Sequence, residues 1–173
     1  CIETDRYYNE VTVGIDFTAR DLQNKLRAQG LPWEISKAFD NSAVLGTFVP
    51  LERVGDVNRI PFHLDINGKT VQEGNTQDML FPVDKIIAYV SRFFTLKIGD
   101  LIYTGTPVGV GPVKIDDHLQ GYIGEQKLLD FFVDNTEKTY EENLIALLFV
   151  FGLLTSAWAD SSRYASESVL NSG

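Results

Sequence analysis

Asp16 is the first residue whose type and position suggest chemistry. It ends an apolar run, residues 11–16, and Thr18 then begins a helix-like pattern, so the carboxylate stands where a strand gives way to a helix. A carboxylate at such a strand end could bind a hard cation such as Mg²⁺, which prefers oxygen ligands. From spacing alone, Asp16 could equally cap the helix or pair with Arg20.

Lys37 and the glycine-rich residues 105–111 could both bind anions. Lys37 lies in an aromatic-rich segment, residues 32–40, where a partly desolvated ammonium could hold an anion or an enolate, although a solvated lysine fits the same pattern. Residues 105–111 (GTPVGVG) follow an apolar run, and their three glycines allow backbone N–H groups to surround a carboxylate or phosphate. The segment fits neither a Walker loop nor the dinucleotide fingerprint, and a tight structural turn explains the same glycines.

The elements that must position these residues follow from the apolar pattern. Residues 11–16 read as a strand, and Thr18 with an acidic residue three positions later predicts a capped helix that ends near Gln29. Leu22 and Leu26 would form the buried face of this helix.

The middle of the chain predicts a hairpin, a second helix and further strands. Residues 62–66 alternate apolar and polar side chains up to Asn67-Gly68, a dipeptide typical of a tight hairpin turn, and the chain returns over residues 69–73. Pro82 begins a helix with apolar residues at helical spacing as far as Phe94. Further strands are predicted at residues 43–49, 101–104, 113–115, 122–123 and 128–133.

Composition narrows the class of protein. The chain has 173 residues, of which 44% are hydrophobic and 12% aromatic, enough for one ordinary core. Its 24 acidic and 15 basic residues give a net charge of −9, so a partner held through phosphates, nucleic acid above all, is not expected. A single cysteine, Cys1, excludes an internal disulfide and a zinc site of several thiolates, and it favours the cytoplasm. A mature lipoprotein also begins with cysteine, which is the alternative.

Residues 134–173 differ in character from the rest, which predicts a boundary near Asp134. All six prolines precede it, and the tail contains residues 144–156, 13 residues without a charge, followed by the small-x-small pattern at 157–159. The run is shorter than the roughly 20 apolar residues that span a bilayer. A signal-like segment, a helix buried in the protein or against a partner chain, and a tail joined by fusion all fit it. Membrane contact through residues 144–158 is not favoured.

Several segments, in order, resemble the catalytic domain of the fumarylacetoacetate hydrolase family. The first is residues 14–23, which match the pattern Gly-x-Asp-x-Thr-Ala-Arg-Asp-Leu-Gln. It is followed by the Lys37 segment, by residues 73–81 (EGNTQDMLF) and by residues 99–111 (GDLIYTGTPVGVG). The likeness covers about residues 7–133, and it implies an α+β fold, a mixed β-sheet roll with two short helices.

This resemblance implies an enzyme that acts on 1,3-dicarbonyl or 2-oxo acids, such as acylpyruvates or fumarylacetoacetate-like compounds. Members hydrolyse a C–C bond, decarboxylate, or isomerise keto and enol forms, as in the 2-hydroxyhepta-2,4-diene-1,7-dioate isomerase type, and the sequence leaves the choice among them open. All these reactions place negative charge on an enolate or neighbouring oxygens, which a divalent cation stabilises as a Lewis acid. The implied cofactor is Mg²⁺, or Mn²⁺ or Ca²⁺, and the implied assembly is a homodimer.

The resemblance also carries over roles to individual residues. Asp16 would be a metal ligand, and Lys37 and Gln23 would contact the substrate or its developing charge. Thr106, in a turn with Gly105 and Pro107, would bind a substrate carboxylate together with nearby backbone N–H groups.

The chain departs from the family pattern at its beginning. The family places a Glu-x-Glu pair of metal ligands upstream of the first matched segment and a histidine-bearing lid further upstream. The sequence shows neither, and Glu3 and Asp5 are too close to Asp16 to replace the pair. We therefore expect residues 1–133 to form a partial catalytic domain without its N-terminal part, followed by an unrelated apolar tail at 134–173. Such a chain could be inactive alone, and the alternative function is a non-catalytic binding or oligomerisation module derived from this fold.

Overall fold

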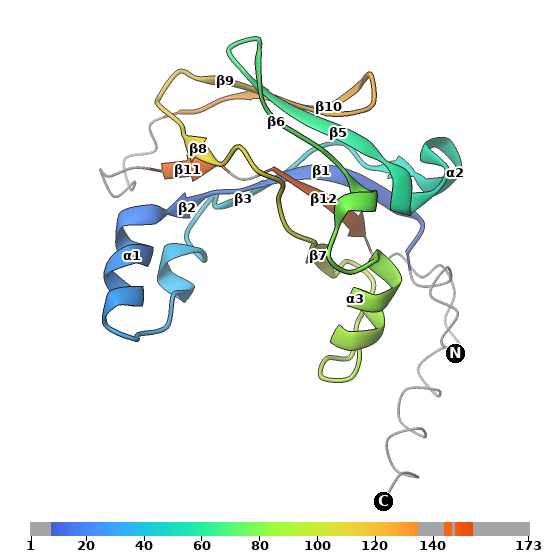
Figure 1. Ribbon diagram of the computed structural model, residues 1–173, viewed down its shortest axis with the longest axis horizontal. Helices are drawn as coiled ribbons and strands as arrows, with labels where there is room; N and C mark the ends of the chain where they lie inside the picture. Colours follow the sequence, from blue (N-terminus) through green and yellow to red (C-terminus); the bar gives the residue numbers. More distant parts are fainter. Residues whose placement is uncertain (1–7, 135–143, 147, 154–173) are drawn as a thin grey trace, which may run out of the picture.

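The computed structural model describes residues 8–134, 144–146 and 148–153. The strands form two larger sheets that face each other and one small sheet beside them (Figure 1). The strand pairs within these residues are antiparallel. The predicted α+β class, sheets with few helices, is confirmed.

The sheets are named here by their place in the fold. The inner sheet has the order β3-β1-β12-β7, with β4 beside β1. Its strands are β1 (Glu10–Asp16), β3 (Ala43–Leu45), β4 (Val49–Pro50), β7 (Leu101–Tyr103) and β12 (Leu148–Leu153). The outer sheet, in the order β10-β9-β5-β6, consists of β5 (Pro61–Ile66), β6 (Lys69–Asn75), β9 (His118–Ile123) and β10 (Gln126–Phe132). The small sheet places β11 (Leu144–Ala146) between β2 (Thr18–Ala19) and β8 (Gly111–Pro112).

The hydrophobic core lies between the inner and outer sheets. Val13 and Ile15 of β1 are fully buried there, in one cluster with Leu64 of β5 and Leu119 of β9. The strand β9 approaches β1 so closely that a Cβ at Gly121 would lie 2.9 Å from Val13 Cγ2. This close approach fixes the strand that carries Asp16 against the outer sheet.

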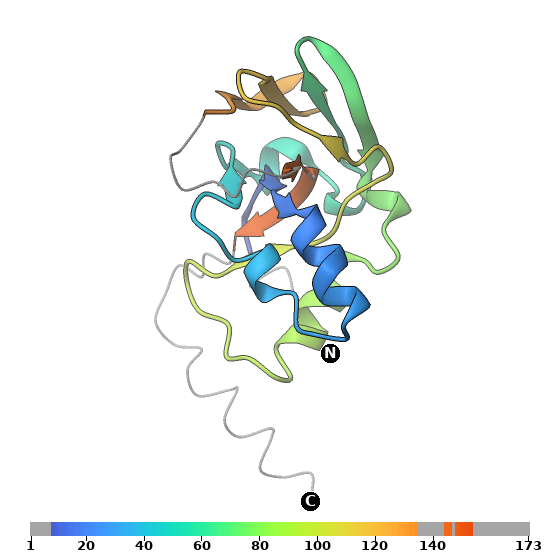
Figure 2. The ribbon, with the colours of Figure 1, turned by 90° about the vertical axis from the view of Figure 1, so that its left-hand side faces the viewer.

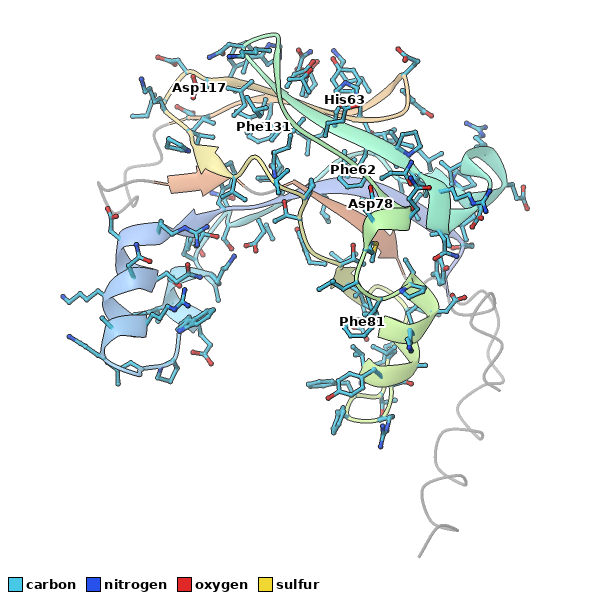
Figure 3. All side chains as sticks on the ribbon, viewed as in Figure 1. Phe62, His63, Asp78, Phe81, Asp117 and Phe131 are labelled. Atoms are coloured by element: carbon cyan, nitrogen blue, oxygen red, sulfur yellow. The ribbon has the colours of Figure 1, made fainter. Side chains whose placement is uncertain are left out.

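The predicted hairpin at Asn67-Gly68 is present between β5 and β6. Both residues have positive φ, 53° and 74°, a conformation that tight hairpin turns require and that Asn and Gly adopt most readily. Side chains alternate along β5 as predicted (Figure 3): Phe62 is buried, and His63 lies on the outer side, stacked on Tyr122 of β9 with 4.4 Å between the ring centroids.

The helix α1 (Arg20–Ala28) begins later than the Thr18 cap predicted. Thr18 is fully buried in β2, and the residue before the helix makes no side-chain cap. The predicted buried face is also wrong, because Gln23 is the buried residue of α1, whereas Leu22 and Leu26 are half-buried. The physical reason is that α1 projects from the small sheet and does not lie across a sheet face (Figures 1 and 2).

The helix α3 (Val83–Val90) ends before Phe94, the predicted end. Val83 and Ile87 are its buried residues, and they form a small second cluster with Tyr8. Phe93 and Phe94 are 65% and 66% exposed, because this end of α3 extends away from the sheets (Figure 1). The pattern does not predict four short helices: α2 (Leu51–Val54), η2 (Glu34–Ser36), η3 (Val57–Arg59) and η4 (Thr76–Asp78).

Two predicted strands are placed differently in the structure. Residues 43–49 form β3 and β4, separated at Gly46, where a Cβ would lie 2.6 Å from the Leu128 carbonyl oxygen. The strand predicted at 113–115 is replaced by β8, which begins at Gly111. In both cases the strand boundaries depend on neighbouring strands, whose positions cannot be predicted from the local sequence.

The apolar run at 144–156 does not form the helix considered for it. Its described residues form β11 and β12, and β12 lies between β1 and β7, with Val150 opposite Val13. A continuous apolar run is typical of a strand covered on both faces, and periodicity does not distinguish such a strand from a buried helix. Strands on the two sides of Asp134 therefore pair with each other. The division of the chain into two domains near Asp134 stays a prediction.

Other expectations fall on parts of the chain beyond this description. Cys1, Glu3, Asp5 and the pattern at 157–159 lie outside the described residues. Among the helices that are described, none has the length and apolar character needed to cross a membrane.

Candidate active site

Two strands of the inner sheet deliver the candidate residues to the same edge. Both β1 and β7 pair antiparallel with β12, so they run in the same direction. Phe151 of β12 lies opposite Thr12 of β1 and Tyr103 of β7, which sets the register. Asp16 and Thr106 come shortly after these two residues, so both emerge at the carboxyl ends of their strands. The strand axes are two spacings, about 10 Å, apart.

The small sheet connects the same two segments a second time. Ile145 of β11 lies opposite Thr18 on one side and Pro112 on the other. The start of α1 and the end of the glycine-rich loop, residues 105–111, are therefore also two strand spacings apart.

Asp16, Thr18 and Lys37 form a hydrogen-bonded cluster at this edge. Lys37 Nζ donates to Asp16 Oδ2 at 2.6 Å and to Thr18 Oγ1 at 2.7 Å. The side chains of Lys37 and Asp16 are 32% and 21% exposed, so the ion pair is partly withdrawn from water. Arg20, considered as a partner of Asp16, instead donates from Nη1 to Gln23 Oε1 at 2.6 Å.

The helix η2 places Lys37 beside the strand end. The Lys37 N–H donates to the Glu34 carbonyl oxygen at 2.9 Å, and the buried Ser36 hydroxyl donates to the Trp33 carbonyl oxygen at 2.6 Å. An open hollow of about 460 Å³ next to this turn is lined by Pro32, Trp33, Glu34 and Lys37. Lys37 is therefore partly open to solvent on the side of this hollow.

The glycine-rich loop is held against β6 at two points. The buried Gln72 side chain donates from Nε2 to Thr106 Oγ1 at 3.0 Å and to the Pro107 carbonyl oxygen at 3.2 Å. Farther along, Gly109 lies so close to β6 that a Cβ there would come within 2.3 Å of the Val71 carbonyl oxygen. These contacts hold the loop against the outer sheet.

The loop backbone uses conformations that favour glycine. Gly105 and Gly109 have φ values of 110° and 103°, which residues with a Cβ rarely adopt. Thr106, between them, is exposed, so its side chain can meet a ligand while its neighbours turn the chain.

Tyr103 is a further group near this edge. The residue is half-buried and its hydroxyl oxygen is buried. Burial, and secondly the negative charge of Asp16, raise the pKa of Tyr103 to about 12. Its hydroxyl is therefore neutral at physiological pH and can donate a hydrogen bond.

The described residues do not form a metal site by themselves. Within residues 8–134 there is no group of three or more His, Cys, Asp or Glu side chains that could hold an ion. The Asp16 carboxylate, the predicted ligand, accepts a hydrogen bond from Lys37. One carboxylate is a poor site for Mg²⁺, so the remaining ligands would have to lie outside these residues.

The structure brings some sequence-predicted residues together and adds others. Asp16 and Lys37 are in contact across 21 positions of sequence. Gln23 remains on α1, bonded by its helix neighbour. Sequence reasoning missed Thr18 as a partner of Lys37, and it missed Gln72. The available signal for Gln72 was an amide at an inward-facing position of a strand, which is too common to single out.

The sequence matches the family described as "Fumarylacetoacetate (FAA) hydrolase C-terminal" over residues 6–139. The order of motifs and the two-sheet α+β fold agree with this match. The chain therefore belongs to the fumarylacetoacetate hydrolase family.

Two curated relatives that the chain matches are longer than the chain itself. The mitochondrial oxaloacetate tautomerase FAHD1 of Homo sapiens is 40% identical over 131 residues, which cover 76% of this chain and 59% of the relative. The oxaloacetate tautomerase YcgM of Escherichia coli is 48% identical over 108 residues, 62% of this chain and 49% of the relative. The chain thus spans about half to three fifths of the length of these curated relatives.

A solved structure with the same fold is that of the fumarylpyruvate hydrolase from Pseudomonas aeruginosa, in complex with Mn²⁺ and pyruvate. It superposes with a TM-score of 0.67 at 33% sequence identity, covering 75% of this chain and 65% of that chain. The likeness confirms the predicted fold of the fumarylacetoacetate hydrolase type.

Proposed function

We propose that this chain carries part of the active site of an enzyme that acts on small 2-oxo acids, and that the reaction is keto–enol isomerisation of oxaloacetate or a close analogue. The observation that carries the proposal is the placement of the Lys37–Asp16–Thr18 cluster and the Thr106 loop at one edge of the inner sheet. The human and bacterial relatives, both named oxaloacetate tautomerases, support the choice of reaction.

The chemistry of a 2-oxo acid fits two anion-binding groups carried by strands that flank a common neighbour, β12. Isomerisation moves a proton between carbon and oxygen, and negative charge builds on the enolate oxygen as it moves. The Lys37 ammonium, oriented by Asp16 and Thr18, lies where it could donate a hydrogen bond to that oxygen. Thr106 and the backbone N–H groups of its loop would hold a carboxylate of the same molecule.

A divalent cation belongs to the proposal, with ligands beyond those described. Mg²⁺, or Mn²⁺ or Ca²⁺ in its place, would add positive charge at the substrate oxygens. Asp16 would contribute one ligand, and the others would come from polypeptide outside the described residues or from the second subunit of a homodimer. The fumarylpyruvate hydrolase solved with Mn²⁺ supports a divalent ion in this fold.

Hydrolysis of a C–C bond and decarboxylation are the other reactions proposed for this site, since both pass through a similar enolate. A non-catalytic binding or oligomerisation module is the alternative from a different class. It is favoured by a specific observation: within the described residues no group of three or more His, Cys, Asp or Glu side chains comes together to hold an ion. The cytoplasmic location also stays a prediction.

The test is a metal titration and an activity assay on the full chain. We expect Mn²⁺ to bind by calorimetry, and the loss of enol-oxaloacetate, followed by ultraviolet absorbance, to be faster with protein and Mn²⁺ than with Mn²⁺ alone. Asp16→Asn should abolish both effects, whereas Glu125→Gln, which removes an exposed carboxylate in a hairpin turn, should change neither. Absence of binding and of activity would overturn the catalytic proposal for this chain.

A further inference from the structure

Gln72 is a buried amide in a strand that is otherwise accessible. It is 1% exposed, and it is the one residue of β6 whose side chain is buried. A buried amide must be hydrogen-bonded, because an unsatisfied one costs about 1–3 kcal/mol. Its Nε2 donates to two acceptors in the glycine-rich loop, more than 30 positions along the sequence.

The direction of these hydrogen bonds is fixed by chemistry. The same Gln72 atom lies 3.2 Å from the Pro107 carbonyl oxygen and 3.0 Å from Thr106 Oγ1. A carbonyl oxygen only accepts, so this atom must be the amide nitrogen, and the reverse orientation of the amide would set two acceptors against each other. Thr106 Oγ1 therefore accepts a hydrogen bond from Gln72.

This has a consequence for the Thr106 proton. A hydroxyl that accepts from one partner still has its own proton to donate, in a different direction. Because Thr106 is exposed and the Gln72 side of its oxygen is occupied, the proton is available to a ligand on the open side of the loop. An anion such as a carboxylate is the acceptor that this arrangement suits best.

The backbone around Thr106 keeps this geometry in place. Gly74 of β6 also lies against the loop, since a Cβ there would be 3.2 Å from Pro107 Cβ. Gly109 fixes the other end of the loop against the Val71 carbonyl oxygen. The outer sheet therefore supports the loop segment that carries Thr106.

We propose that Gln72 is a positioning residue that orients the Thr106 hydroxyl to donate a hydrogen bond to the carboxylate of a 2-oxo acid. The inference rests on the proposed function for the identity of the ligand. It adds a residue of the outer sheet to a site built otherwise at the edge of the inner sheet.

The test uses pyruvate as a carboxylate probe, with binding followed by NMR at the amides of residues 105–111. We expect Gln72→Met, which keeps the shape and removes the donor, to raise the Kd of pyruvate about 10-fold. Gln72→Glu, whose carboxylate would accept the Thr106 proton, should raise it further. The matched control is Gln120→Met, on the outer face of β9, which should leave the Kd unchanged.

A double-mutant cycle separates orientation of Thr106 from general support of the fold. In a Thr106→Val background, Gln72→Met should have little further effect on the Kd, whereas a merely structural role would weaken binding equally in both backgrounds. Thermal unfolding should confirm that the variants are folded.

The outcomes distinguish this inference from the proposed function. Pyruvate binding that is unchanged in Gln72→Met overturns the inference and leaves the proposed function intact. Absence of pyruvate binding at the loop in the unaltered chain also overturns the inference, and the proposed function is then judged separately by the enol-oxaloacetate assay.

Discussion

Two lysine–aspartate ion pairs in this molecule are alike in chemistry and different in position. Lys37 and Asp16 are 21 residues apart in sequence and meet where β1 ends. Lys127 and Asp130 are three residues apart and both lie on β10, at the surface of the outer sheet. The first pair exists only because of the fold, whereas the second can form within one strand.

The surroundings of the two aspartates differ as well. Asp130 accepts from Lys127, from His118 Nε2 at 2.5 Å and from Gln120 Nε2 at 3.2 Å. The hydrogen bonds from Lys127 and then His118 hold the pKa of Asp130 well below its usual range. Asp16 shares its lysine with a buried threonine, beside an open hollow.

The difference teaches that position in the fold, more than residue type, indicates function. An exposed pair with several local partners orders a surface hairpin and contributes little to stability. A pair that is partly withdrawn from water, at a strand end next to a glycine-rich loop, is the better candidate for a functional site.

The largest expected effect comes from removing the two lysines in turn. Lys37→Met should lower the rate of enol-oxaloacetate isomerisation about 100- to 1,000-fold, the usual loss when a group that stabilises developing negative charge is removed. Lys127→Met should stay within about twofold of the unaltered chain, since its charge faces water away from the site. Equal losses of activity in the two variants would mean that the position of Lys37 in the fold gives it no special role in the reaction.

The next effect concerns the glycines that shape each region. Gly109→Ala should destabilise the protein by about 2–3 kcal/mol in urea denaturation, because a Cβ would meet the Val71 carbonyl oxygen in addition to the cost of positive φ. Gly124→Ala, in the hairpin between β9 and β10, has a φ of 55° and open space around it, so about 1 kcal/mol is expected. A Gly109→Ala loss no larger than that of Gly124→Ala would show that the loop is not held against β6.

Much of the fold follows from local pattern, and the candidate site follows only in part. The alternation up to Asn67-Gly68 determines a hairpin because turn and strand signals agree within a few residues. The pattern also points to Asp16, Lys37 and the Thr106 loop as chemically interesting. The partners of these groups are not local, however, so spacing could suggest Arg20 for Asp16 but could not bring in a lysine 21 positions away.

Local sequence pattern also does not determine which segments and side chains are buried. The apolar run that forms β12 reads equally well as a buried helix, because its strand partners, β1 and β7, lie far away in the sequence. Gln72 illustrates the same point for a polar residue. Its amide contacts the glycine-rich loop, which lies against β6, and no residue near Gln72 in the sequence predicts that contact.

Tyr103 allows the inner-sheet side of the comparison to be tested by alkaline titration. Its pKa is raised from the usual 10.0 to about 12, so folding favours the neutral phenol. The resulting stability is fully present below pH 10 and is lost as pH rises from 10 towards 12. Tyrosinate absorbance should show a late-titrating component that disappears in Tyr103→Phe. If the late component persists in that variant, another tyrosine is responsible for it.

The smallest effect is expected at Asp130, on the outer side of the comparison. Because the pKa of Asp130 is lowered from its usual 3.8, its contribution to stability is present above that pH and is lost as pH falls below it. Asp130→Asn should therefore slightly reduce stability near neutral pH and flatten the acid side of the profile below about pH 4. Thermal unfolding between pH 2 and pH 7 would measure this, with Asp65→Asn on β5 of the same sheet as the matched control. An Asp130→Asn profile parallel to that of the unaltered chain would mean that the cluster around Asp130 does not form in solution, and the outer pair would then lose its value as a structural counterpart to Lys37 and Asp16.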